Sequence, residues 1–72
     1  MTTLRDLWIS KRLTSTEVAA RAGISTPTLY KANRKEVIAE RNLIAICQVL
    51  GISRDEYEAL DVCPMADRYR QP

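Results

Sequence analysis

The stretch that most constrains the fold is residues 14–33, which read TSTEVAARAGISTPTLYKAN. Thr14 and Glu17 have the spacing of a capping box, in which each side chain bonds the backbone amide of the other at the start of a helix. Gly23 ends this helix, because glycine enters the left-handed conformation at a helix C-terminus without a steric penalty. Ser25 caps the helix that follows. The stretch therefore predicts two short helices joined by a tight turn.

The second of these helices has an inward and an outward face. Leu29 and Ala32 face inward at a spacing of i and i+3. Pro27 is tolerated in the first turn, where backbone amides have no acceptor within the helix. The outward side chains are Thr26, Pro27, Tyr30, Lys31 and Arg34. Two short helices of this kind form the layout of a helix-turn-helix, whose second helix enters the major groove of DNA.

Another helix, from about residue 4 to residue 12, is predicted before this pair, with either of the two preceding threonines as its cap. Leu4, Leu7 and Trp8 share one face of it at helical spacing. Trp8 is therefore most simply a core residue that covers the second helix of the pair. A tryptophan that stacks on DNA bases or intercalates between them is the alternative.

Two more helices are predicted after the pair. Residues 40–50 have apolar positions at i, i+3, i+4 and i+7, so this helix should lie at the centre of the fold, with Ile44 broadening its apolar stripe and Gly51 ending it. Ser53 caps the last helix, with Glu56 as its capping-box partner. The inward side chains of these two helices are Leu43, Ile46, Cys47, Leu50, Tyr57 and Leu60.

Residues 34–39 are predicted to form a loop, with Val37 and Ile38 tucked against the core. We expect one domain at residues 1–61, near the size at which a single core is only marginally stabilising. A tail follows at residues 62–72, and it could be frayed, a short extra helix or a dimer arm. A shared interface between two copies would add useful burial to so small a domain.

Charge is unevenly distributed along the chain. Residues 1–35 hold seven basic and two acidic side chains, whereas residues 36–72 hold four basic and seven acidic ones. The predicted helix-turn-helix thus lies in a half of net charge +5, and the other half has a net charge of −3. A solvated surface is the ordinary explanation of such charges. However, the positive charge lies in the same half of the chain as the predicted helix-turn-helix, which favours a nucleic-acid partner.

Composition argues against several other functions. The chain has no histidine, and its two cysteines, Cys47 and Cys63, lack the spacing of a metal site, so neither a metal, nor a cofactor, nor an imidazole base is predicted. We expect no enzyme activity, because glycine-rich loops and clustered carboxylates are also missing. Cys47 is expected to be a buried structural thiol. Without a signal peptide or a membrane-length apolar run, the expected location is the cytoplasm.

The central stretch resembles the phage-repressor and Cro class of helix-turn-helix proteins, the XRE-type family. Residues 43–57, LIAICQVLGISRDEY, are similar to the family's fourth helix and the cap of its fifth, and the resemblance covers roughly residues 4–60. It implies an all-α fold: a compact five-helix lambda-repressor-like domain with the helix-turn-helix at its second and third helices. The matching features of the central stretch are Val18-Ala19, Gly23, Ile24, Ser25 and Leu29.

Carried over position by position, the resemblance implies two sets of DNA-contacting residues. Lys31 can donate to guanine, Thr26 and Pro27 can pack on a thymine methyl group, and Tyr30 can reach a base or a phosphate. For Thr26 and Thr28, the alternative to DNA contact is a side chain that only caps the helix or is solvated. The base-reading candidates are Thr26, Pro27, Tyr30 and Lys31. The phosphate-contacting candidates are Ser15, Thr16, Ser25, Thr28, Arg34 and Lys35.

The chain departs from the family pattern at two places. The family often has a partly buried Arg–Glu ion pair, and the matching positions here are Trp8 and Asn33. Replacement of both charged partners together can leave the stability of the fold nearly unchanged. Where the family has a glutamine at the start of the second helix, this chain has Ser15. Serine can bond a phosphate oxygen, but we expect it to be too short to brace a base-reading side chain.

The sequence thus predicts sequence-specific binding to double-stranded DNA by a small transcriptional regulator, similar to a phage or mobile-element repressor. We expect a homodimer, weak in solution and assisted by DNA, on a pseudo-palindromic operator. Its contacts are expected in the second half of the chain, where the loop at residues 34–39, the last helix and the tail are candidates. The alternative is a protein-interaction module such as an antitoxin or antirepressor, which would expose an apolar patch on the fifth helix or tail.

Overall fold

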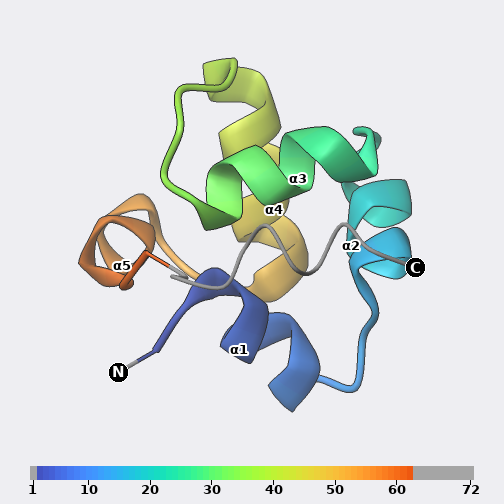
Figure 1. The fold of residues 1–72 in the computed structure, drawn as a ribbon, viewed down its shortest axis with the longest axis horizontal. Coiled ribbons are helices and arrows are strands. Elements are labelled where there is room, and N and C mark those ends of the chain that lie inside the picture. Colours follow the sequence, from blue (N-terminus) through green and yellow to red (C-terminus); the bar gives the residue numbers. More distant parts are fainter. Residues whose placement is uncertain (1, 63–72) are drawn as a thin grey trace.

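The computed structural model describes residues 2–62 (Figure 1). Within them the chain forms five helices: α1 (Leu4–Ser10), α2 (Ser15–Ala22), α3 (Thr26–Asn33), α4 (Glu40–Leu50) and α5 (Arg54–Ala59). The one bridge between extended residues in this part is an isolated parallel pair, Thr3 with Asp61, beside a bond from the Asp61 amide to the Thr2 carbonyl of 2.8 Å. The predicted all-α, five-helix fold is confirmed. The expectations about Cys63 and most of the 62–72 tail concern residues outside the described part.

Side-chain caps decide where most helices begin. In α2, Thr14 Oγ1 accepts the Glu17 amide at 3.1 Å, and Glu17 Oε1 accepts the Thr14 amide at 3.0 Å. The same reciprocal arrangement joins Ser53 and Glu56 at α5, as predicted, and a third one starts α1. Of the two threonines that could cap α1, the structure selects Thr3, with Asp6 as its partner.

Left-handed residues end four of the helices. Gly23 after α2 and Gly51 after α4 have φ values of 72° and 68°, as the sequence predicts. Arg12 and Lys35 take the same conformation after α1 and α3, at φ 59° and 61°. In each case the next amide bonds back to the carbonyl five residues earlier, as Leu13 does to Trp8 at 2.9 Å. This turn ends α1 at Ser10, two residues before the predicted end.

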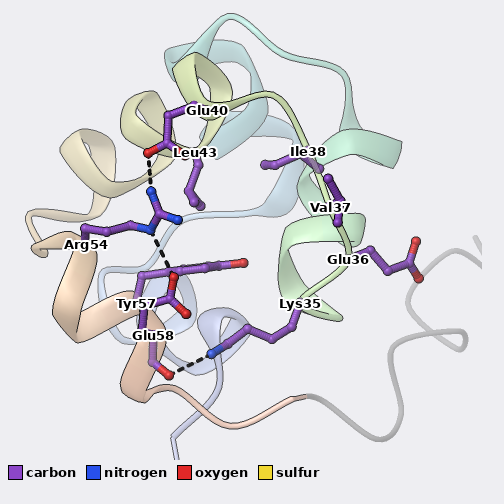
Figure 2. Close-up of a pocket in the computed structure, with 9 residues that line it drawn as sticks. All are labelled: Lys35, Glu36, Val37, Ile38, Glu40, Leu43, Arg54, Tyr57 and Glu58. Atoms are coloured by element: carbon purple, nitrogen blue, oxygen red, sulfur yellow. Dashed lines mark hydrogen bonds and ion pairs between the residues drawn. The ribbon is translucent and has the colours of Figure 1, made fainter.

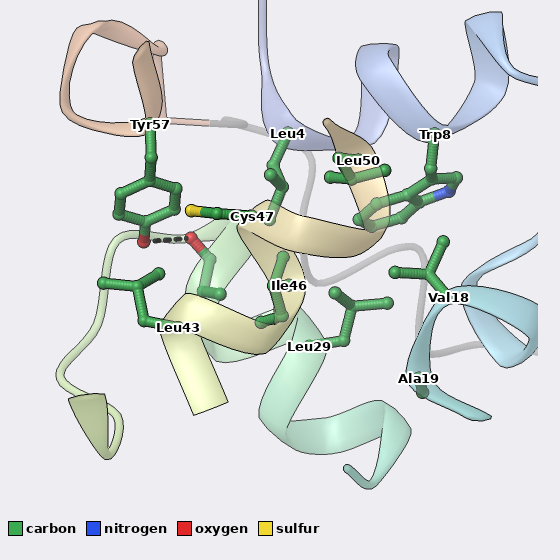
Figure 3. Close-up of a cluster of buried hydrophobic side chains, with 11 residues drawn as sticks. Leu4, Trp8, Val18, Ala19, Leu29, Leu43, Ile46, Cys47, Leu50 and Tyr57 are labelled. Atoms are coloured by element: carbon green, nitrogen blue, oxygen red, sulfur yellow. Dashed lines mark hydrogen bonds between the residues drawn. The ribbon is translucent and has the colours of Figure 1, made fainter. Parts of the chain in front are cut away.

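The core is a single cluster to which every helix contributes (Figure 3). α4 passes through its centre and supplies the largest share, as its apolar spacing predicts, and Tyr57 of α5 closes one end. The Tyr57 hydroxyl donates to the Ala32 carbonyl at 2.9 Å, which joins α5 to α3. The buried apolar side chains are Leu4, Trp8, Val18, Ala19, Leu29, Ala32, Leu43, Ile46, Cys47, Leu50 and Tyr57.

Two predicted core positions are wrong. Ile44 is 48% exposed, because it lies beside the buried ridge of α4, which consists of Leu43, Ile46, Cys47 and Leu50. Val37 is 96% exposed, and only its neighbour Ile38 packs against the core. Of the two residues predicted to pack this loop against the core, only Ile38 does so.

Trp8 and Asn33 are both buried, at 3% and 1% exposure, but they do not pair with each other. Asn33 Oδ1 accepts the backbone amide of Arg5 at 3.1 Å, so it links the end of α3 to the start of α1. The Trp8 ring instead packs edge-on against Tyr30, with ring centroids 6.5 Å apart. The core position predicted for Trp8 is confirmed, and its place under α3 excludes an exposed, base-stacking role.

Candidate nucleic-acid interface

The outer face of α3 is presented by a helix whose inner face is fully enclosed. Leu29 and Ala32 are 0% and 1% exposed, so α3 cannot rotate without opening the core. Pro27 and Lys31, one turn apart, are exposed on the other side, and Thr26 beside them is half-buried. An exposed helix face of this kind can enter the DNA major groove, which admits one α-helix.

Tyr30 is not simply outward, as the sequence predicts, but half-buried between two partners. Its ring meets the Trp8 ring at an interplanar angle of 64°, an edge-on arrangement that aromatic pairs favour. Its hydroxyl lies 3.0 Å from Ser15 Oγ, and either atom can be the donor. The side chain is thus held at both ends.

The expectation that Ser15 is too short to brace a residue of the recognition helix is wrong. Serine is short, but Tyr30 is long enough to span the gap from α3 to the first residue of α2. The contact brings together one predicted phosphate residue and one predicted base-reading residue. Sequence reasoning missed it because the two positions are fifteen residues apart and no short-range rule connects them.

The three other hydroxyl residues predicted to contact phosphate also lie at the starts of α2 and α3. Ser25 Oγ accepts the Thr28 amide at 3.3 Å and lies 2.9 Å from Thr28 Oγ1, so both side chains serve the cap of α3. Thr16 is exposed in the first turn of α2. The amides of a first helical turn favour an anion, but the Ser25–Thr28 pair also fits the simpler role of capping.

The two basic residues after α3 differ from the predicted outward phosphate clamp. The Arg34 side chain is only 18% exposed, and it forms an ion pair with Glu36. The Lys35 ammonium donates to the Glu58 carbonyl of α5 at 3.0 Å and lies 5.0 Å from the centre of the Tyr57 ring. The Lys35 side chain is thus directed to α5 rather than along α3.

Two buried groups have shifted pKa values, and both belong to the core. Burial raises the pKa of the Cys47 thiol above its ordinary 9.0. Burial, with Glu58 nearby, raises the pKa of the Tyr57 hydroxyl above its ordinary 10.0. Both residues are therefore held in their protonated, uncharged forms, which fits the structural role expected for Cys47.

In residues 2–62, no three acidic, cysteine or histidine side chains come together in a way that could hold a metal ion. None of the helices there is long and apolar enough to cross a membrane.

Five helices with α2 and α3 joined by the Gly23 turn define a helix-turn-helix domain. The family model of the Cro/C1-type helix-turn-helix DNA-binding domain matches residues 3–56, which is most of the chain. The chain belongs to this family, as the resemblance of its central stretch indicates, and it is a DNA-binding protein. No curated protein and no solved structure gave a match.

Proposed function

We propose that this protein binds double-stranded DNA sequence-specifically and acts as a small transcriptional regulator, as a repressor of phage or mobile-element origin would. The observation that carries the proposal is the exposed Pro27–Lys31 ridge on a helix whose opposite side is buried to 1% or less at Leu29 and Ala32. A rigid ridge in the basic half of the chain can carry a lysine to a guanine edge without a large entropic cost.

Base reading is assigned to the outer face of α3. Lys31 donates to guanine O6 or N7, and Pro27 and Thr26 pack against thymine methyl groups. Tyr30 has a smaller share than the sequence alone suggests, because its ring and hydroxyl are both engaged.

Phosphate contacts are assigned mainly to the helix starts. Ser15 and Thr16 lie at the N-terminus of α2, where unpaired amides and the helix dipole attract a phosphate. Ser25 and Thr28 occupy the same position in α3. Arg34 and Lys35 are the weaker members of the set, since Glu36 and the Glu58 carbonyl hold them in the free protein, and DNA would have to compete for them.

The protein is further proposed to work as a homodimer on a pseudo-palindrome with half-sites about one DNA turn apart. One domain presents one ridge, so a single copy reads only half of such a site. A dimer that forms fully on the operator can occupy a promoter in the bacterial cytoplasm and exclude the polymerase. The rival role, a protein-interaction module, has no support from α5, whose exposed side chains are Arg54, Asp55, Glu56, Glu58 and Ala59.

The experiment is selection of bound sequences from a random pool of duplex DNA by this protein. We expect enrichment of one motif, with two copies related by a two-fold axis. The affinity for the enriched duplex should fall steeply with salt, because each phosphate contact releases counterions. Retention without any enriched sequence, or no retention at low salt, would remove the proposal.

A further inference from the structure

The C-terminal end of α3 is fastened to α5 by a buried hydrogen bond. The Tyr57 hydroxyl donates to the Ala32 carbonyl at 2.9 Å, and the two residues are 4% and 1% exposed. The same carbonyl accepts the backbone amide of Lys35 at 3.0 Å. Because a carbonyl oxygen has two lone pairs, each of them has a donor here. The turn that ends α3 and a side chain from a distant helix therefore meet at one oxygen atom.

The Lys35 side chain adds a second link between α3 and α5. Its ammonium donates to the Glu58 carbonyl at 3.0 Å and lies 5.0 Å from the centre of the Tyr57 ring (Figure 2). Lys35 has a left-handed backbone with φ 61°, which glycine adopts more easily than any residue with a side chain. Glycine at this position would have no side chain to reach α5. The lysine thus joins the end of α3 to α5 through both its backbone and its side chain.

The attachment of α5 to the rest of the fold depends mainly on Tyr57. Of the six described residues of α5, only Tyr57 is buried. Arg54 also joins α5 to Glu40 of α4, but this ion pair is exposed and such pairs contribute little. A groove of about 340 Å³ lies between α5, the 34–39 loop and the start of α4, so these segments are not closely packed there (Figure 2).

The base-reading candidate Lys31 lies in the last turn of α3, directly before Ala32. The last turn of a helix is its weakest part, because its carbonyls have no partners within the helix. Helix ends of this kind open locally at a low free-energy cost. If the turn is not already ordered, binding to a base edge must order it first and loses affinity. The group that holds the Ala32 carbonyl therefore controls how well Lys31 is placed.

We propose that Tyr57 is a positioning residue for base reading by α3. It is buried and contacts no DNA. It acts through the Ala32 carbonyl, which keeps the last turn of α3, and Lys31 on it, in the conformation that fits a base edge. In this way α5 contributes to sequence preference although most of its exposed charged side chains are acidic. The inference rests on the proposed function, because it concerns the same helix and the same bases.

A positioning role can be told apart from a general contribution to stability by where its loss appears. Removal of the Tyr57 hydroxyl should loosen the last turn of α3 and leave its first turn unchanged, because Ser25 caps that end. Phosphate contacts from the helix starts should persist, so affinity for DNA of unrelated sequence should hardly change. Affinity for the selected sequence should fall, since only that binding needs Lys31 against a base.

The test is Tyr57→Phe, which removes the hydroxyl and keeps the ring that packs in the core (Figure 3). The matched control is Val49→Ala, which removes two methyl groups from a partly buried side chain of α4. Because valine has no polar side-chain atom, this control lowers global stability without removing a side-chain hydrogen bond. Each protein is titrated onto the selected duplex and onto scrambled duplex DNA at one salt concentration.

We expect Tyr57→Phe to bind the selected duplex about two- to tenfold more weakly, where tenfold corresponds to the full free energy of one neutral hydrogen bond. Its affinity for scrambled DNA should match that of the wild type, and Val49→Ala should keep wild-type affinity for both duplexes. An unchanged ratio of the two affinities in Tyr57→Phe, or an equal fall of that ratio in Val49→Ala, overturns the positioning role. Wild-type protein that does not distinguish the two duplexes refutes the proposed function instead.

Hydrogen exchange measured by NMR is a second readout that needs no DNA. The three amides that bond back to carbonyls at the end of α3 are those of Arg34, Lys35 and Glu36. In Tyr57→Phe these amides should exchange about two- to tenfold faster. The Leu29 amide, which bonds to the Ser25 carbonyl in the first turn, should change no more than it does in Val49→Ala. Equal acceleration at both ends of α3 would show that Tyr57 only stabilises the fold, and it would overturn the positioning role.

Discussion

Removal of the hydroxyl pair that joins α2 to α3 tests how the recognition helix is held. Ser15→Ala and Tyr30→Phe each delete one hydroxyl of the 3.0 Å contact and leave the Tyr30–Trp8 ring packing in place. A neutral hydrogen bond contributes about 0.5–1.5 kcal/mol net to folding. Because both residues are only half-buried and water can replace a lost partner, we expect about 1 kcal/mol from each single variant.

The double variant should cost about the same as either single one, which gives a coupling energy of about 1 kcal/mol in a double-mutant cycle. The free energy of unfolding in urea is the measurement, with the affinity for a single half-site as the second readout. Ser10→Ala is a matched control, because the Ser10 hydroxyl bonds the Leu7 carbonyl of its own helix. Its effect should add to that of Tyr30→Phe. If the Ser15 and Tyr30 effects also add, the two hydroxyls do not hold each other in solution.

Three further predictions concern stability. Trp8→Ala should lower the free energy of unfolding by about 3–5 kcal/mol through a cavity under α3, and an unchanged urea midpoint would contradict its core position. The free energy of unfolding of the wild-type protein should fall as pH rises above about 9–10, because folding raises the pKa values of Cys47 and Tyr57. The stability that these two groups contribute is fully present below their ordinary pKa values. It is lost as the pH rises through their pKa values in the folded state. Tyr57→Phe should flatten that fall in pH-dependent urea unfolding, and an equal slope in both proteins would contradict the assignment. Arg12→Gly should raise the free energy of unfolding by about 0.5–1 kcal/mol, since glycine adopts a left-handed backbone without strain. Gly23→Ala should lower it for the same reason. If both variants changed the free energy of unfolding in the same direction, this reasoning would be refuted.

Local rules predict most helix ends correctly. The pairs Thr14–Glu17 and Ser53–Glu56 lie three residues apart, and both form the reciprocal bonds that the spacing indicates. Gly23 likewise takes the conformation for which glycine is suited. These features depend on neighbours in sequence, so one sequence suffices to find them.

Positions set by tertiary packing were not predicted. Arg12 and Lys35 end helices in a left-handed conformation that arginine and lysine do not favour, so residue preference alone does not predict these two helix ends. Val37 and Ile44 are as apolar as their buried neighbours, yet they face away from the core, because periodicity alone does not say how wide the covered face is.

Only the part of the candidate site that depends on helical spacing was predicted from the sequence. The outward positions of Pro27 and Lys31 follow from helical spacing and are found in the structure. The engagement of Tyr30 by Ser15 and of Lys35 by α5 depends on contacts fifteen and twenty-three residues apart. Side-chain length, rather than spacing, decides whether such partners meet.

The measurement that tests the central claim most directly is the affinity of Lys31→Ala for selected and for scrambled duplex DNA at one fixed salt concentration. Lys11→Ala, which removes an exposed lysine from the turn after α1, is the control for lost charge. If α3 reads bases, Lys31→Ala should lose about 1–3 kcal/mol on the selected duplex and relax the preference at one base pair. It should lose much less on scrambled DNA, and Lys11→Ala should affect both duplexes alike. Equal losses on both duplexes for Lys31→Ala, or none on either, would contradict the claim that this helix reads sequence.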